Sequence, residues 1–158
     1  MEARLADARP EPADGIAALH DRIMIQDLVN RYAHCVRRQD VDGILDLFTE
    51  DAMVDFDRSA VDDGGRKQGK AALRPVYEAG FRAMIPWPMM VNHVVDFDGA
   101  DRAHGTVCIE LRQGALGYRV SWIGTYEDIY VRQRGRWLFQ SRITEVHHIA
   151  PEPRTQER

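Results

Sequence analysis

One histidine and a small set of aromatic side chains are the residues of this chain best suited to chemistry. His93 lies in an alternating apolar stretch, and a period of two places it on one strand face with Val91, Val95 and Phe97. An imidazole in such dry surroundings can act as a general base with a pKa near the working pH. It can equally be a core histidine bonded to a backbone group. The spacing leaves both interpretations open.

Tyr32 and two aromatic residues of a later strand are the other candidates. Tyr32 lies on the apolar stripe of a helix, one turn before Val36. Its phenol either packs in the core with a satisfied hydroxyl or holds a substrate oxygen that gains negative charge. Trp122 and Tyr126 share a strand face with Gly124 between them, so their rings either flank a ligand or pack against the core.

The remaining polar residues are weaker candidates. Glu110 lies on the polar side of a strand whose apolar face carries Ile109. His147 and His148 are strand neighbours that face opposite ways, so they cannot chelate a metal from one face. The sequence also lacks a phosphate-binding glycine loop, a zinc motif and a serine-nucleophile motif. It therefore predicts no metal site and no cofactor.

Length, charge and cysteine content bound the class of protein. The chain has 158 residues, 44% of them hydrophobic, which is typical of one folded domain. A net charge of −4 gives no basic field to attract nucleic acid or an anionic membrane, and no apolar run approaches the roughly 20 residues of a membrane span. Cys35 and Cys108 form neither a disulfide framework nor a zinc knuckle. We expect a cytoplasmic protein with no nucleic-acid and no membrane partner.

Hydrophobic periodicity predicts helices first and strands afterwards. We expect a flexible N-terminal arm over residues 1–15, one domain over 16–149 and a polar C-terminal tail over 150–158. This order predicts an α+β domain with its helices gathered on one face of a curved antiparallel sheet. The expected helices cover 17–38, a short segment after Asp40, and a segment from 69 that ends before Pro86; the expected strands are 52–56, 89–97, 105–112, 117–132 and 136–146.

Three blocks of sequence resemble a known family. The first contains Ile25-Gln26-Asp27-Leu28, Arg31-Tyr32-Ala33 and the run from Asp40 to Phe56; the second is Val91-Asn92-His93; the third runs from Gly124 to Phe139 and includes a Gly135-Arg136-Trp137 element. Together they resemble the SnoaL-like proteins of the nuclear transport factor 2-like superfamily. The resemblance covers roughly residues 16–149.

The resemblance implies a cone-shaped α+β barrel, in which a strongly bent antiparallel sheet wraps around three N-terminal helices and leaves an apolar pocket. The chain looks nearest to the branch of scytalone dehydratase, hexachlorocyclohexane dehydrochlorinase and bile acid 7α-dehydratase, which are cofactor-free lyases. By this resemblance His93 is the catalytic base and Tyr32 a second catalytic residue. The expected substrate-binding residues are Val36, Arg37, Phe56, Val91, Ile109, Trp122 and Tyr126.

The chain departs from the family pattern at one important position. Arg37 stands where these lyases have an aspartate that pairs with the histidine, and a guanidinium there lowers the histidine pKa. Either Arg37 binds an acidic substrate group while neutral His93 acts as base, or Asp55 or Asp128 replaces the missing carboxylate. In addition, Phe56 replaces a second pocket tyrosine.

We therefore expect a cofactor-independent lyase (a dehydratase or other elimination) or isomerase. It would act on a small, mostly apolar, cyclic molecule, from which His93 abstracts a proton. The alternative is a small-molecule-binding or dimerisation module of the same fold without catalysis. Epoxide-opening hydrolase chemistry needs paired aspartates with an arginine, a set not found in the sequence. We also expect a homodimer or homotrimer, with the sheet face of Cys108 and Glu110 available for contact.

Overall fold

A computed structural model describes residues 15–151 of the chain. Most of the expected N-terminal arm and C-terminal tail lie outside the described residues. The elements in chain order are α1 (Gly15–Arg38), α2 (Val41–Asp46), β1 (Phe48–Phe56), β2 (Gly65–Gln68), α3 (Lys70–Ala83), β3 (Pro86–Phe97), β4 (Arg102–Gln113), the 3₁₀ turn η1 (Gly114–Leu116), β5 (Arg119–Gln133) and β6 (Arg136–Ile149).

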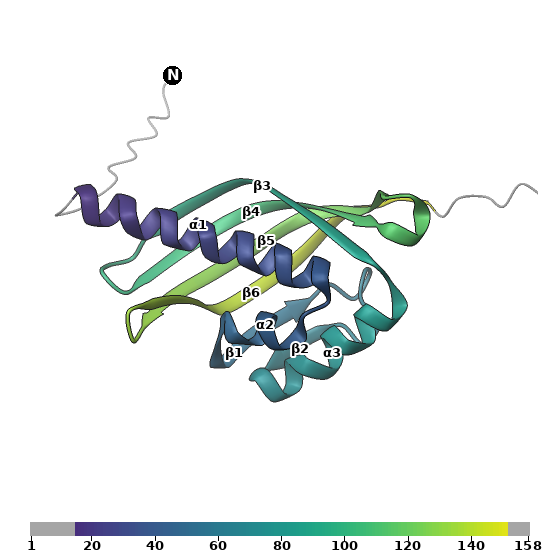
Figure 1. The fold of residues 1–158 in the computed structure, drawn as a ribbon, viewed down its shortest axis with the longest axis horizontal. Helices are drawn as coiled ribbons and strands as arrows, with labels where there is room; N and C mark the ends of the chain where they lie inside the picture. The colour runs from purple at the N-terminus through teal and green to yellow at the C-terminus, as the bar shows by residue number, and fades with distance from the viewer. Residues whose placement is uncertain (1–14, 152–158) are drawn as a thin grey trace, which may run out of the picture.

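Six strands form one curved sheet in the order β2-β1-β6-β5-β4-β3. The long helix α1 lies along one face of this sheet, while α2 and α3 lie beside β1 and β2 (Figure 1). The structure thus confirms the predicted α+β class with helices on one face of a bent sheet. One detail differs from the sequence prediction: β1 and β6 pair in parallel, so the sheet is mixed. A further difference is β2, which is not among the strands expected from the sequence.

Local sequence signals account for the helices that bring residues to the interior. The apolar stripe of α1 is buried from Ile25 to Val36, as its three- and four-residue spacing predicts. The side chain of Asp40 caps α2 by accepting a hydrogen bond from the backbone nitrogen of Gly43 at 2.8 Å. Helix α3 continues through Pro75 in its second turn, where the proline removes one backbone hydrogen bond, to the carbonyl of Ala71.

An irregularity in β3 decides which of its side chains face the interior. The register of β3 against β4 shifts between Val91 and Val94, and Asn92 has a φ of 55°. One extra residue reverses the alternation of faces. Pro88 is therefore buried before the bulge and Val95 after it, whereas Val91 is 49% exposed. The prediction that Val91 shares a face with His93 is wrong, because strict period two does not survive the bulge.

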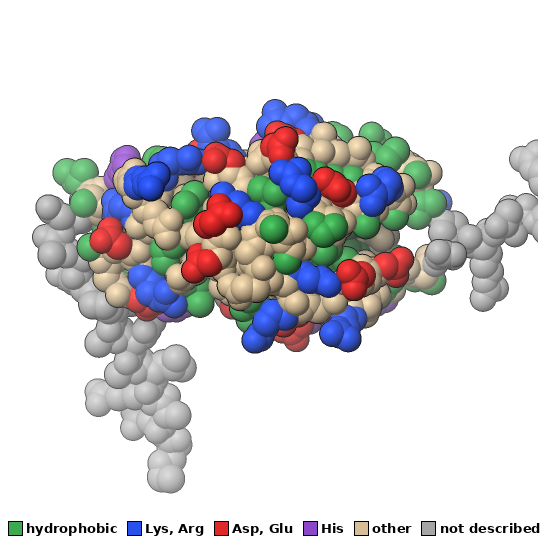
Figure 2. Space-filling model, turned by 90° about the horizontal axis from the view of Figure 1, so that it is seen from below, with side chains coloured by type: hydrophobic (Ala, Val, Ile, Leu, Met, Phe, Trp, Pro, Cys, Tyr) green, Lys and Arg blue, Asp and Glu red, His purple; other side chains and the backbone are tan. Residues whose placement is uncertain are grey.

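The outer face of the sheet carries several exposed apolar side chains. Val91 lies opposite Cys108, and Cys108 lies opposite Thr125 on the next strand. Exposed Ile123 and Ile143 lie on the same face. On the side of the molecule seen in Figure 2, basic and acidic side chains are interspersed. Within the described residues no helix is long and apolar enough to span a membrane. The expected homo-oligomer stays a prediction.

Asp21 ties the N-terminal half of α1 to the β5–β6 hairpin. Its carboxylate accepts hydrogen bonds from Trp137 Nε1 at 3.0 Å and from Arg132 Nη2 at 2.6 Å. Burial acts to raise the pKa of Asp21, but the bonds from Trp137 and Arg132 outweigh it and hold the pKa below its usual value. The ionised carboxylate is therefore part of what holds the helix on the sheet.

We predict that Asp21→Asn lowers the free energy of unfolding by about 2 kcal/mol at pH 7, because it removes a charge-assisted hydrogen bond. Since the folded pKa is depressed, this stability is present above the unfolded pKa of about 3.9 and is lost as pH falls through the folded value. The difference from the unsubstituted protein should therefore shrink below about pH 4. Urea unfolding across this pH range measures it.

Asp27→Asn is the matched control on the same helix, since Asp27 pairs with Arg31 near the surface. That change should cost less than about 0.5 kcal/mol. Equal losses of unfolding free energy in Asp21→Asn and Asp27→Asn would contradict the role of Asp21 in holding α1 on the sheet.

Candidate functional site

A small cavity lies between α1, α3 and the concave face of the sheet. Its volume is about 100 Å³, and its wall is almost entirely apolar and aromatic. Tyr32 and Val36 come from α1, Tyr77 and Phe81 from α3, and Trp122 and Tyr126 from β5. A partly open, mostly apolar space with a few polar groups has the character of a small-molecule site, although this one is smaller than most.

Two tyrosines supply hydroxyl groups to the cavity wall. The hydroxyls of Tyr32 and Tyr77 lie 3.1 Å apart and share a hydrogen bond. Burial raises the pKa values of Tyr77 and Tyr126 well above the usual value for tyrosine. These phenols are therefore neutral at physiological pH, so they can donate or accept hydrogen bonds but do not act as anionic bases.

Among the described residues of the cavity wall, Arg142 is the only one with a charged side chain, and it is paired with Asp128. Nε and Nη2 of Arg142 each donate to the Asp128 carboxylate at 2.7 Å, and both side chains are almost completely buried. Burial alone would lower the pKa of Arg142, but the charge and hydrogen bonds of Asp128 hold it well above its usual value. The guanidinium is therefore permanently charged, and that charge is compensated.

One nitrogen of Arg142 remains unsatisfied. Its Nη1 is buried and has no hydrogen-bond partner among the described residues. The guanidinium carbon lies 4.2 Å from the ring centre of Tyr32, 4.2 Å from that of Tyr126 and 4.3 Å from that of Phe139. These aromatic faces stabilise the cation but do not accept the Nη1 hydrogens as an oxygen would. A buried donor without an acceptor is costly and points to a missing partner.

A second bulge places Arg142 inside. Asp128 and Arg142 are directly opposite each other on β5 and β6, and the register shifts between Ile129 and Tyr130. Phe139 is buried before this shift, so strict alternation would put Arg142 on the outer face. Sequence reasoning missed Arg142 for this reason. The available signal was Asp128, a carboxylate on the same period-two face as Tyr126 and Tyr130.

His93 does not line the cavity; it contacts Tyr130, whose hydroxyl is bonded to Asp128 of the Asp128–Arg142 pair. Its Nδ1 is 3.0 Å from Gln26 Oε1, and its Nε2 is 2.9 Å from the Tyr130 hydroxyl. That hydroxyl donates to Asp128 at 2.9 Å. Burial is the largest influence on the pKa of His93 and lowers it. His93 therefore belongs to a hydrogen-bonded chain that ends at Arg142.

The predicted site residues thus separate into five groups. The structure brings Tyr32, Val36, Phe56, Trp122 and Tyr126 together on the cavity wall. Ile109 is buried in the surrounding core, Val91 lies on the outer sheet face, His93 lies behind Arg142, and Arg37 lies outside the cavity. The two expected catalytic residues do not share this cavity: Tyr32 lines it and His93 does not. Of the two carboxylates considered as replacements, Asp128 reaches His93 through Tyr130, whereas Asp55 lies near Arg66.

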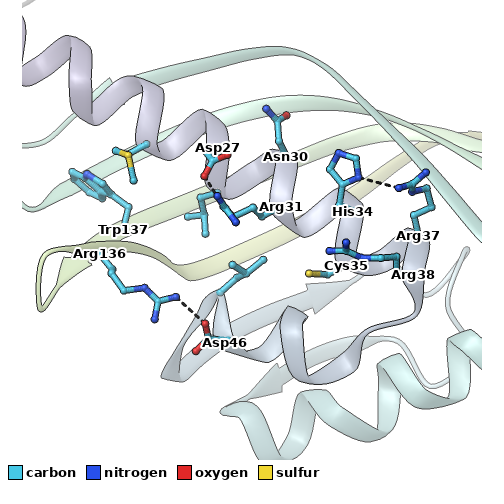
Figure 3. A pocket seen from close by; sticks show the side chains of 13 residues that line it. Asp27, Asn30, Arg31, His34, Cys35, Arg37, Arg38, Asp46, Arg136 and Trp137 are labelled. Atoms are coloured by element: carbon cyan, nitrogen blue, oxygen red, sulfur yellow. Dashed lines mark hydrogen bonds and ion pairs between the residues drawn. The ribbon is translucent and has the colours of Figure 1, made fainter.

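A wider, open groove of about 970 Å³ runs along the outer side of α1 (Figure 3). Arg37 lies here, 3.3 Å from His34 Nδ1 and stacked over Trp87. Figure 3 shows two ion pairs in this groove, Asp27 with Arg31 and Asp46 with Arg136. Because these groups are largely solvated and already paired, the groove shows no unsatisfied buried group comparable to Arg142.

The cavity can bind and polarise an oxygen, but its described lining supplies no base. None of the residues 15–151 that form its wall is a histidine, an aspartate or a glutamate. No three His, Cys, Asp or Glu side chains of the described residues gather as a metal site would require. For epoxide opening the Asp128–Arg142 pair is present, but a second aspartate is missing from the described lining. The arrangement provides hydrogen-bond donors in a dry space.

Comparisons with known proteins agree with this architecture. A family model described as a SnoaL-like domain matches residues 17–143. No curated protein is significantly similar in sequence. The fold is similar to that of Rv3472, a protein of unknown function from Mycobacterium tuberculosis, at 25% identity, a TM-score of 0.76, and coverage of 87% of this chain and 78% of that chain.

Two further solved structures show the same fold. A scytalone dehydratase-like protein from Novosphingobium aromaticivorans is 18% identical, with a TM-score of 0.73 and coverage of 87% and 91% of the two chains. Hexachlorocyclohexane dehydrochlorinase LinA-type3 from Novosphingobium barchaimii is 19% identical, with a TM-score of 0.72 and coverage of 87% and 94%. At these identities the likeness establishes the fold.

We predict that Asp128→Asn destabilises the protein by about 3–5 kcal/mol, because it leaves the Arg142 guanidinium buried without a counter-ion. The double variant Asp128→Asn/Arg142→Met should lose clearly less than the sum of the two single changes, since removing both charges leaves none uncompensated. Chemical denaturation of all four proteins measures the coupling. If the losses of unfolding free energy in the two single variants add up to that of the double variant, the energetic coupling of Asp128 and Arg142 is contradicted.

Proposed function

Because the chain belongs to the SnoaL-like domain family, we propose that its interior cavity binds a small, mostly apolar ring molecule, and that Arg142 holds an oxygen of this ligand. One observation carries the proposal: Arg142 lines the cavity, and its buried Nη1 nitrogen has no acceptor among the described residues. A ligand oxygen there supplies the missing hydrogen bond. The neighbouring Tyr32 and Tyr77 hydroxyls offer a second polar contact.

The charge balance favours a neutral oxygen over a carboxylate. Asp128 already compensates Arg142 with two hydrogen bonds of 2.7 Å. A second anion beside this pair would carry an uncompensated charge into a low-dielectric space. A ketone, ether or alcohol oxygen accepts the Nη1 hydrogen without that cost. The ligand class is therefore a carbonyl or hydroxyl compound.

The size of the cavity favours a single ring. Its volume of about 100 Å³ is somewhat below the roughly 150 Å³ of an apolar protein cavity that binds benzene. Rings from Tyr32, Tyr77 and Tyr126 form its walls and suit a flat ligand. The cavity therefore has room for no more than one small ring, and an oxygen substituent on that ring supplies an acceptor for the free donor.

A second candidate function is lyase or isomerase chemistry on this ligand. The observation in its favour is the position of a permanent cation beside the proposed oxygen in a dry cavity. Loss of a proton next to a carbonyl places negative charge on that oxygen, and a preorganised donor stabilises this charge most where water is excluded. Family membership is consistent with this chemistry. Arg142 and Tyr32 then act as the electrophilic half of the reaction.

The lyase hypothesis also requires a base that reaches the ligand. Proton abstraction by His93 would require its ring to reach the ligand, and both ring nitrogens are occupied by Gln26 and Tyr130. The binding function needs no such movement. For this reason ligand binding is the primary proposal and catalysis the second.

We predict that cyclohex-2-enone binds at least about tenfold more tightly than cyclohexene, because a hydrogen bond from a charged donor contributes about 1.5–3 kcal/mol. The two probes have the same ring and differ in the acceptor oxygen. Ligand-observed NMR titration measures both affinities.

The double variant Asp128→Asn/Arg142→Met is the matched control, because it removes the donor and its counter-ion while keeping side chains of similar size. It should bind both probes equally. Equal affinities in the unsubstituted protein would contradict the role of Arg142, and no binding of either probe would contradict the cavity proposal.

For catalysis we predict exchange of the α-hydrogens of cyclohexanone for deuterium in heavy water above the rate in buffer. Proton NMR follows the exchange. Dependence on His93, with loss in His93→Gln while binding is kept, supports this residue as the base. Binding without exchange above the buffer rate rules out proton abstraction from this ketone and leaves the binding function.

A further inference from the structure

Four side chains form an unbroken hydrogen-bonded chain from the edge of the core to the cavity. His93 Nε2 lies 2.9 Å from the Tyr130 hydroxyl, and that hydroxyl donates to Asp128 Oδ2 at 2.9 Å. Asp128 in turn accepts from Nε and Nη2 of Arg142 at 2.7 Å each. Tyr130 and Arg142 are almost completely buried, whereas His93 is only half-buried. One end of the chain can exchange protons with solvent while the other faces the cavity.

The Tyr130 hydroxyl is the element with two states. It has one proton and two acceptors within reach, Asp128 Oδ2 and an unprotonated Nε2 of His93. When the imidazole is doubly protonated, Nε2 donates to the Tyr130 oxygen, and the tyrosine proton is committed to Asp128. When the ring is neutral with its proton on Nδ1, which faces Gln26 Oε1 at 3.0 Å, Nε2 competes for the tyrosine proton.

We propose that His93 is a positioning residue for Arg142: through Tyr130 and Asp128, its protonation state sets how strongly Arg142 Nη1 binds an acceptor oxygen in the cavity. A protonated ring adds positive charge behind the carboxylate and fixes the Tyr130 proton on it. Asp128 then compensates Arg142 less completely, so the Nη1 hydrogen attracts a ligand oxygen more strongly. This role rests on the proposed ligand function of the cavity.

The surroundings of His93 set the pH range of this effect. The charged groups that face the ring are Arg22 from α1, Asp128 from β5 and Arg142 from β6. On β4 the facing residue is Gly105, where a Cβ would lie 3.2 Å from His93 Nε2, so no side chain separates the ring from Tyr130. Burial lowers the pKa of His93, Asp128 raises it in part, and the two arginines lower it again. The net effect lowers the pKa of His93 from its usual value, so the ring becomes protonated only as the solution is acidified.

The direction follows from thermodynamic linkage. Because the protonated state binds the acceptor oxygen more tightly, affinity rises as pH falls through the pKa of His93. By reciprocity, a bound ligand raises the pKa of His93 by the same coupling. We expect affinity for cyclohex-2-enone to increase about fivefold between pH 8 and pH 5, at the lower end of the usual range for coupled sites.

The link is tested first without ligand. In two-dimensional NMR, the Arg142 Nε–H resonance should shift with pH, with the same midpoint as the His93 ring. The shift should disappear in Tyr130→Phe, which cuts the chain, and in His93→Gln, which has no titrating ring. His104→Gln is the matched control, since His104 is exposed and bonded to Asp98 at 3.0 Å outside the chain. Circular dichroism establishes that each variant is folded.

The same proteins are then titrated with cyclohex-2-enone at several pH values. A fivefold pH dependence that is present in His104→Gln and flat in Tyr130→Phe supports the proposal. An Arg142 resonance that does not follow His93, or an affinity profile unchanged by Tyr130→Phe, overturns it. Failure of the ketone to bind at every pH contradicts the proposed function, whereas the ligand-free titration still decides whether His93 controls Arg142.

Discussion

The buried pair of Asp128 and Arg142 is the interaction on which the interior of this protein depends. Two charges between β5 and β6 are tolerated because the carboxylate receives two guanidinium hydrogen bonds and a third from Tyr130. Aromatic rings of Tyr32, Tyr126 and Phe139 surround the cation and exclude water. This enclosure leaves one buried donor, Arg142 Nη1, without an acceptor among the described residues. Without the pair, the site would be a hydrocarbon space with tyrosine hydroxyls.

Two bulges decide which side chains meet in this interior. The bulge near Asn92 places Pro88 on the cavity wall and turns His93 toward Gln26 and Tyr130. The shift near Tyr130 brings Arg142 from the outer face to the inner face. Each inserts one residue into a strand and reverses the alternation beyond it. The chemistry of the site is therefore a consequence of strand register.

The same architecture serves proteins with different chemistry, so the site must carry the functional argument. The fold is shared with a hexachlorocyclohexane dehydrochlorinase at 19% identity, a level that transfers no reaction. In this chain the interior supplies a cation and hydroxyl donors, while the histidine lies behind them. A binding function needs only the Arg142 cation and the tyrosine hydroxyls, whereas a lyase also needs the histidine to reach the ligand.

The sequence by itself determined the fold class, the limits of the helices to within a few residues, and some of the aromatic residues of the cavity, but it did not single out Tyr77 and Phe81, which also line it. Tyr32, Trp122 and Tyr126 could be predicted because helical and strand periodicity fix their faces locally. The tertiary structure alone decided the place of His93 and Val91 and the inward direction of Arg142. These depend on one-residue bulges and on pairing between strands distant in sequence, and a strict period of two cannot register either one.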